Sequence, residues 1–206
     1  MKKKFFLLCF IASFLGYAQQ DLKFNISNVF IYEANISYEK SLNDFLTLGG
    51  FAGFAYGLPD NDEANKYVYL GPELRYYVAP KNGADQFFVG VYSRAVSGNA
   101  LITFEESGLS LVNGWYDYYY QTERVNYFKL ALGFTLGSKW VTKNGFVYGV
   151  FGGLGRNIIH AYDETSFEPH TKYFQLDTYS SSIRNENDSK YWDFRIGFNV
   201  GWRFGK

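Results

Sequence analysis

The clearest pattern in the sequence is a strict alternation of apolar and other residues close to its carboxyl end. From 192 to 204, every second residue is large and apolar, and the positions between them hold Asp, Arg, Asn or Gly. Seven consecutive matches to a period of two predict a β-strand with two different faces. A strand of this length can cross a bilayer, because a tilted strand needs about 9 to 11 residues to do so.

The same alternation recurs upstream and predicts eight strands in all. They are expected near 22–28, 32–39, 45–57, 67–78, 87–94, 128–137, 146–156 and 192–204. The runs 45–57 and 146–156 are apolar and rich in glycine, so their inward and outward faces stay ambiguous. An even number of strands is typical of an antiparallel up-and-down barrel with both termini on the same side.

The links between these strands alternate in length. Three of them, 41–44, 80–85 and 138–145, are short, whereas 97–123 and 157–190 on the opposite side are long and 58–65 is intermediate. Short turns on one side and long loops on the other are typical of outer-membrane barrels. Pro72 falls within an expected strand, where it cannot donate a ladder hydrogen bond, so we expect a β-bulge at Gly71-Pro72.

The environment of the two faces decides between a membrane barrel and a soluble one. A soluble, lipocalin-like barrel would turn its large apolar residues inward, whereas a membrane barrel turns them toward lipid. The non-apolar face is rich in glycine, which suits a narrow, crowded lumen, and Trp192 and Trp202 lie where interfacial aromatic girdles are expected. We therefore predict an all-β protein: an eight-stranded antiparallel up-and-down transmembrane β-barrel.

The first residues have the layout of a secretory signal peptide. Three lysines, Lys2 to Lys4, precede an apolar run that is too short to span a bilayer as a helix, and Gly16-Tyr17-Ala18 follows. We expect cleavage after Ala18, with 1–18 as the signal peptide and 19–206 as one barrel domain. Removal of 1–18 takes away the single cysteine and three of the 20 basic residues, which leaves a formal charge of −3. Disulfides are then excluded, and nucleic-acid binding has no electrostatic support.

Charged residues on the predicted inner face form a candidate lumen network. Because an eight-stranded barrel is just filled by its side chains, these charges are expected to pair with one another. The network consists of Lys23, Glu33, Glu39, Glu73, Arg75, Arg94, Lys129, Asp193, Arg195 and Arg203. It predicts a polar plug, and a narrow pore or a carrier of small apolar solutes with a lateral opening is the alternative.

A second group of candidate residues lies in the long links and could form an outer binding surface. Tyrosine and tryptophan offer large contact areas for sugars or partner side chains, although the same aromatics would also serve as a girdle or as an extension of the strand. The candidates are Trp115, Tyr116, Tyr118, Tyr120, His160 and His170.

Metal binding and catalysis are two further hypotheses for the link 157–190. His160 and His170 flank Asp163, Glu164 and Glu168, a set that could hold a divalent metal. A lipid-directed hydrolase would need a nucleophile beside a base, and neither Ser166 nor the run 180–182 stands in such a setting. We expect no catalytic residues, no cofactor and no metal.

Three stretches resemble the small outer-membrane β-barrel proteins of unknown function, an OmpA-like or OmpW-like group of the Gram-negative envelope. They are 34–42 (ANISYEKSL), 71–77 (GPELRYY) and 197–204 (GFNVGWRF). The resemblance implies localisation in the outer membrane, with its lipids and the barrel assembly machinery as partners, an unknown extracellular ligand and no nucleic acid. It implies no catalytic residues. Such barrels commonly end on an aromatic residue, whereas here Phe204 is followed by Gly205 and Lys206.

Overall fold

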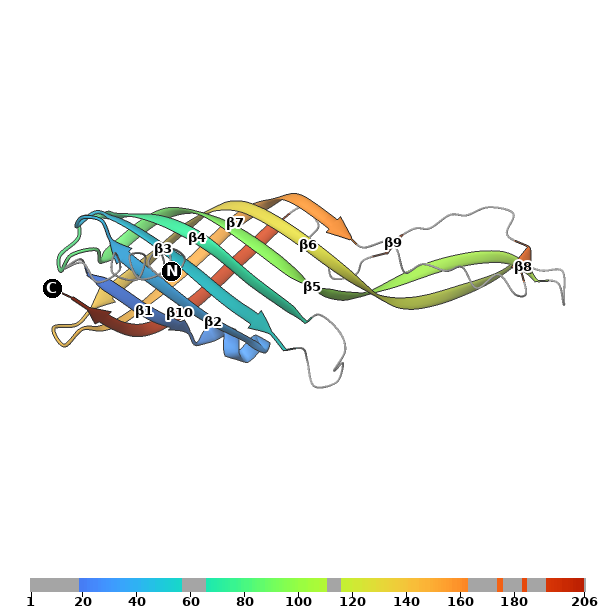
Figure 1. Cartoon of the computed structure of the whole chain (residues 1–206), viewed down its shortest axis with the longest axis horizontal. Coiled ribbons are helices and arrows are strands. Elements are labelled where there is room, and N and C mark those ends of the chain that lie inside the picture. The colour runs from blue at the N-terminus through green and yellow to red at the C-terminus, as the bar shows by residue number, and fades with distance from the viewer. Residues whose placement is uncertain are drawn as a thin grey trace, which may run out of the picture.

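The eight long strands of the described chain form one antiparallel sheet that closes on itself as a barrel (Figure 1). The computed structural model describes residues 19–56, 66–110, 116–162, 174–175, 183–184 and 192–205. Each barrel strand pairs with the strands before and after it, and β1 pairs with β10. The barrel strands are β1 (Gln20–Asn25), β2 (Glu33–Ser41), β3 (Leu46–Ala55), β4 (Tyr67–Val78), β5 (Gln86–Ser110), β6 (Tyr116–Val141), β7 (Phe146–Tyr162) and β10 (Trp192–Phe204). The predicted eight-stranded antiparallel up-and-down barrel is confirmed.

Burial alternates along the strands because successive side chains point to opposite faces of the sheet. In β4, Tyr69, Glu73 and Arg75 are buried in the lumen, and Leu70 and Leu74 between them are exposed on the outside. The same holds around the barrel, so that charged side chains lie inside and large apolar ones outside. This arrangement is the reverse of a soluble, lipocalin-like barrel. It also settles the two ambiguous strands, since Thr47 of β3 and Val147 of β7 are fully buried.

The two ends of the barrel differ. At one end, which we call the floor, the turns 42–45, 79–85 and 142–145 join the strands, β1 begins and β10 ends (Figure 1). The opposite end is called the mouth. The expected link 138–145 is shorter in the structure because β6 continues to Val141, and this extension carries Lys139 into the lumen, where it is 2 % exposed.

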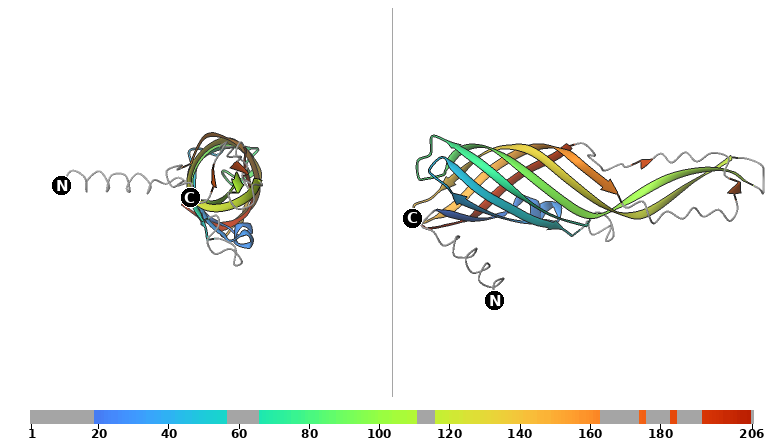
Figure 2. Two further views of the ribbon diagram at one scale, coloured as in Figure 1. Left: turned by 90° about the vertical axis from the view of Figure 1, so that its right-hand side faces the viewer. Right: turned by 45° about the horizontal axis from the view of Figure 1, so that its top comes forward.

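The prediction of a loop over 97–123 is wrong, because most of this segment is a β-hairpin. β4 pairs with β5 as far as Gly98, and β7 pairs with β6 as far as Tyr127. Beyond this rim β5 and β6 pair with each other from Asn99–Asn126 to Leu109–Tyr116, a ribbon of roughly 33 Å at about 3.3 Å per residue. The ribbon projects from the mouth (Figure 2), and the two-residue strands β8 (Phe174–Gln175) and β9 (Ile183–Arg184) pair with its β5 side.

The β-bulge expected at Gly71-Pro72 does not occur. Leu70 pairs with Ala95 and Glu73 with Tyr92 in the same register, so no extra residue is inserted between them. Only the ladder with β5 is interrupted at Gly71 and Pro72, and their pairing with β3 continues. Pro72 lies on the outer face, and glycine is required beside it because a Cβ at Gly71 would overlap the carbonyl oxygen of Ser93.

The first strand is shorter than expected. β1 ends at Asn25, and a 3₁₀ helix, η1 (Ser27–Ile31), replaces the end of the predicted strand 22–28. A left-handed residue, Tyr32 with φ of 57°, leads from η1 into β2.

Candidate functional site: the polar lumen

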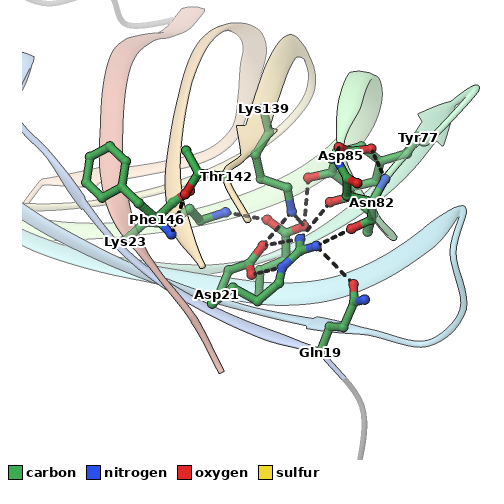
Figure 3. Close-up of polar contacts among 12 residues, drawn as sticks. Gln19, Asp21, Lys23, Tyr77, Asn82, Asp85, Lys139, Thr142 and Phe146 are labelled. Carbon is green, nitrogen blue, oxygen red and sulfur yellow. Dashed lines mark hydrogen bonds and ion pairs between the residues drawn. The ribbon is translucent and has the colours of Figure 1, made fainter. Parts of the chain in front are cut away.

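Arg203 closes the floor of the lumen. Its Nε and Nη2 donate to the two carboxylate oxygens of Asp21 at 2.6 and 2.9 Å, a bidentate pair across the β1–β10 seam. Nη1 donates to Gln19 Oε1 at 3.0 Å and to the carbonyl oxygen of Asn82 at 2.7 Å, and Nη2 also donates to that of Ala84 at 2.9 Å. Every N–H of the guanidinium therefore has an acceptor, and this one side chain ties both terminal strands to the turn 79–85. Figure 3 labels three of its partners, Gln19, Asp21 and Asn82.

Above the floor, the Glu39 carboxylate is shared by several donors. Its Oε1 accepts from Lys139 Nζ at 2.6 Å and from the Tyr77 hydroxyl at 2.7 Å. Its Oε2 pairs with Lys23 and, at 3.2 Å, with Arg75. These side chains come from four different strands and all are buried, so Glu39 is the centre of a network that spans the lumen.

Glu73 and two arginines occupy the middle of the lumen. Arg75 donates to both carboxylate oxygens of Glu73, at 2.9 and 3.0 Å, and Thr135 donates to one of them at 2.8 Å. Arg195 lies farther from this carboxylate, at 3.7 Å, and its guanidinium covers the ring of Phe51 at 3.8 Å. Arg195 is thus held by its contact with an aromatic ring as well as by its charge, and it fills space in the lumen as a hydrophobic side chain would.

Two carboxylates accept hydrogen bonds in the part of the lumen nearer the mouth. Asp193 accepts from Tyr92 at 2.7 Å and from Arg94 at 2.8 Å. Glu33 accepts from Tyr67 at 2.7 Å and also from Tyr69 and Asn28. The Arg94 guanidinium lies 4.2 Å from the centre of the Tyr69 ring, which joins the two groups.

The structure gathers most of the candidate network inside the barrel. Glu33, Glu39, Glu73, Arg75 and Asp193 are buried, and the side chains of Arg94, Arg195 and Arg203 are at most 12 % exposed. Lys129 is half-buried, with its Nζ 4.9 Å from the centre of the Tyr127 ring, and it pairs in register with His160 of β7.

The candidate outer surface is described in part. Tyr116, Tyr118 and Tyr120 are alternate residues of β6 in the projecting hairpin. Trp115 and His170 lie outside the described residues, as do the carboxylates and serines considered for a metal or a hydrolase. Within the described ranges, no group of three or more His, Cys, Asp or Glu side chains could hold a metal.

Sequence reasoning missed two members of the network, Asp21 and Lys139. Lys139 Nζ lies 2.6 Å from Asp21, and the pair bridges the barrel from β6 to β1. The signal was present, because Asp21 stands two residues before Lys23, and Lys139 stands an even number of residues after Lys129. Continuing the alternation past the expected strand ends would have placed both inside.

The lumen is packed closely. The Tyr69 ring occupies the place of a side chain at Gly53, and the Tyr92 hydroxyl does the same at Gly155. A cavity of about 10 Å³, lined by Lys23, Glu39, Glu73 and Arg75 among others, has room for about one water molecule. The described lumen is therefore a plug of paired charges and rings.

These features define a class of protein: a small closed β-barrel with an ion-paired interior and an apolar exterior. A family model described as "Protein of unknown function (DUF3575)" matches residues 4–202, and the chain belongs to this family. No curated protein and no solved structure gave a significant match. None of the helices in the described part of the chain is long and apolar enough to cross a membrane.

Proposed function

We propose that this protein is a non-enzymatic β-barrel of the cell outer membrane, with a lumen closed by paired charges. In this proposal residues 1–18 are a signal peptide that is removed on export. The β5–β6 hairpin and the neighbouring links form a structural or binding surface outside the cell, for a ligand still to be identified. Outer-membrane lipids and the barrel assembly machinery are the partners of the barrel itself.

The observation that carries the proposal is the apolar exterior. Every barrel strand contributes large apolar residues to the outer face, and several are extremely exposed, such as Ile196 at 79 % and Phe134 at 73 %. Exposing such a large apolar surface to water would cost free energy, whereas the hydrocarbon chains of lipids are as apolar as these side chains. Closure of the sheet also pairs most of the backbone groups of the wall, which a spanning structure requires.

Aromatic residues near the two ends support the same orientation. Near the floor, Trp140 stacks on Tyr148 with ring centres 5.4 Å apart, and Trp202 meets Phe146 at 6.2 Å. Near the mouth, Tyr56 at the end of β3 contacts Tyr32. An apolar band flanked by aromatic girdles at its two ends is typical of outer-membrane barrels.

The filled lumen argues against a pore. Arg203 at the floor and Glu39 above it each hold short, buried ion pairs, Arg203 with Asp21 and Glu39 with Lys139. Breaking such pairs is costly because it leaves buried charges without partners. We expect no single-channel conductance when the purified barrel is added to a planar bilayer. Stable conductance steps would instead favour the pore.

Fractionation combined with gel mobility tests the proposal as a whole. We expect the mature chain in the outer-membrane fraction, with Gln19 as its first residue and with different mobility before and after boiling in detergent. A protein found in the soluble periplasm, with no heat-dependent shift, would overturn the proposal.

A further inference from the structure

The barrel wall is incomplete between β10 and β2 on the side of the mouth. The β1–β10 ladder stops at the pair Asn25–Asn199, although β10 continues toward the mouth through 192–198. Past this pair, the Ile26 N–H donates to the Phe198 carbonyl oxygen at 2.9 Å, and the Phe198 N–H donates to the Ser27 hydroxyl at 3.0 Å. Among the described residues, none continues the ladder along 192–197 on this side.

The short helix η1 covers this part of the wall. It lies on the side of the barrel and not within the sheet (Figure 2). Phe30 is 82 % exposed and Val29 56 %, so the helix adds apolar side chains to the exterior. Asn28 is 9 % exposed and donates to Glu33 in the lumen. The helix therefore has an apolar side facing out and an amide facing in.

Few interactions hold η1 in place. Its polar contacts to the wall are those of Asn28 with Glu33 and of Ser27 with Asn25 and Phe198, among the contacts that the structure describes. If Asn28 withdraws, Glu33 keeps the hydroxyls of Tyr67 and Tyr69, so the buried carboxylate is not left without donors. Movement of η1 would thus break few bonds and expose no unpaired charge.

Polar groups without partners lie inside the same part of the barrel. Arg94 Nε is a buried donor and Asn199 Oδ1 a buried acceptor, and neither has a hydrogen-bond partner in the described part of the chain. Buried groups of this kind are normally paired. A carboxylate could accept from Arg94, and a hydroxyl or protonated carboxyl could donate to Asn199.

We propose that η1 is a displaceable plug in a lateral portal between β2 and β10, through which the carboxyl head of a lipid with one apolar chain reaches the buried polar groups behind η1. The chain replaces Phe30 and Val29 at the wall, and the head meets Arg94 or Asn199. The proposal rests on the membrane placement proposed above.

The test follows η1 directly while oleate is added. The full chain carries Cys9→Ser, which removes the native thiol, and a spin label on Phe30→Cys. The matched control carries the label on Phe54→Cys, an outward-facing residue of β3 that is 50 % exposed. Both are inserted into phosphatidylcholine vesicles. We expect oleate to change the mobility of the label at position 30 in a saturable way and to leave the label at position 54 unchanged.

Two further variants separate the plug from the head-group site. Asn28→Ala, which frees the plug, lowers the oleate concentration for half-maximal response by about three- to tenfold, the equivalent of one hydrogen bond. Asn199→Ala raises it. An equal response at positions 30 and 54, or none at position 30 in a barrel that has inserted, overturns the portal. Failure of every variant to insert and show heat-dependent mobility overturns the membrane placement instead.

Discussion

Asp21 and Arg203 lie opposite each other where the first and last strands of the barrel meet, and the guanidinium grips both oxygens of the carboxylate, at 2.6 and 2.9 Å. Arg203 also donates hydrogen bonds to Gln19 and to two carbonyl oxygens of the turn 79–85, so this pair connects the β1–β10 seam to the floor.

Replacement of Arg203 by lysine separates the contribution of the hydrogen-bond geometry of the guanidinium from that of its charge. Arg203→Lys keeps the positive charge but cannot reach all five acceptors, so we expect a loss of about 1 to 3 kcal/mol in the free energy of unfolding. Urea titration of the folded band on an unboiled gel measures it. Arg156→Lys, at an exposed position of β7, is the matched control. Equal stability of the two variants would show that charge alone suffices at the floor.

Removal of Lys139 leaves two buried carboxylates short of a partner. Lys139→Met is expected to destabilise the barrel by about 3 to 5 kcal/mol, because Asp21 and Glu39 each lose an ion pair at 2.6 Å. Lys143→Met, in the exposed turn beside it, should have little effect. Adding Asp21→Asn to Lys139→Met should recover part of the loss, and the absence of any recovery would argue against coupling between the two side chains.

Two neighbouring glycines of the wall should respond differently to alanine. A Cβ at Gly197 would overlap the Asn25 amide and the Phe151 ring, whereas a Cβ at Gly152 meets nothing within 4 Å. We expect Gly197→Ala to cost about 1 to 3 kcal/mol, as overpacking does, and Gly152→Ala to be close to neutral. Thermal unfolding of both variants checks this. Phe151→Leu should partly rescue Gly197→Ala by vacating space.

An exterior charge tests the lipid-facing surface. Phe134→Arg places a cation on the outside of β6 at a position that is 73 % exposed, and we expect a loss of about 2 to 4 kcal/mol for folding into lipid vesicles if this site lies near the bilayer midplane. Phe134→Leu is the control. A barrel in water would tolerate the arginine, so equal folding yields for both variants would contradict the membrane placement.

The projecting hairpin should be dispensable for the barrel. Deleting 99–126 and joining Gly98 to Tyr127 through a two-residue turn leaves the β4–β5 and β6–β7 ladders intact. We expect an unchanged heat-dependent mobility and unfolding midpoint. A barrel that no longer folds would show that the ribbon takes part in closing the sheet.

The sequence is most informative where a strand has two different environments. Phe194, Ile196 and Phe198 alternate with inward-facing residues because one face of the strand meets the exterior and the other meets the lumen. The sequence alone therefore predicted which residues of this strand face outward. The hairpin beyond Gly98 was mistaken for a loop because outside the rim neither face is forced to be apolar, so no period of two is imposed. η1 was missed for another reason: the expected strand was carried to 28, although the alternation of Phe24 and Ile26 ends at Asn28. The helix arises from the early end of the β1–β10 pairing.

The ion pair between Asp21 and Arg203 joins residues separated by 182 positions in the chain. Contacts between residues so far apart in the sequence slow folding, because the entropy of closing a long loop is lost before they form. A nascent or truncated chain that stops before Arg203 lacks the cation that grips Asp21 and cannot complete the seam. The last strand of the barrel thus controls closure, since β1 gains its full set of partners only once Arg203 is in place.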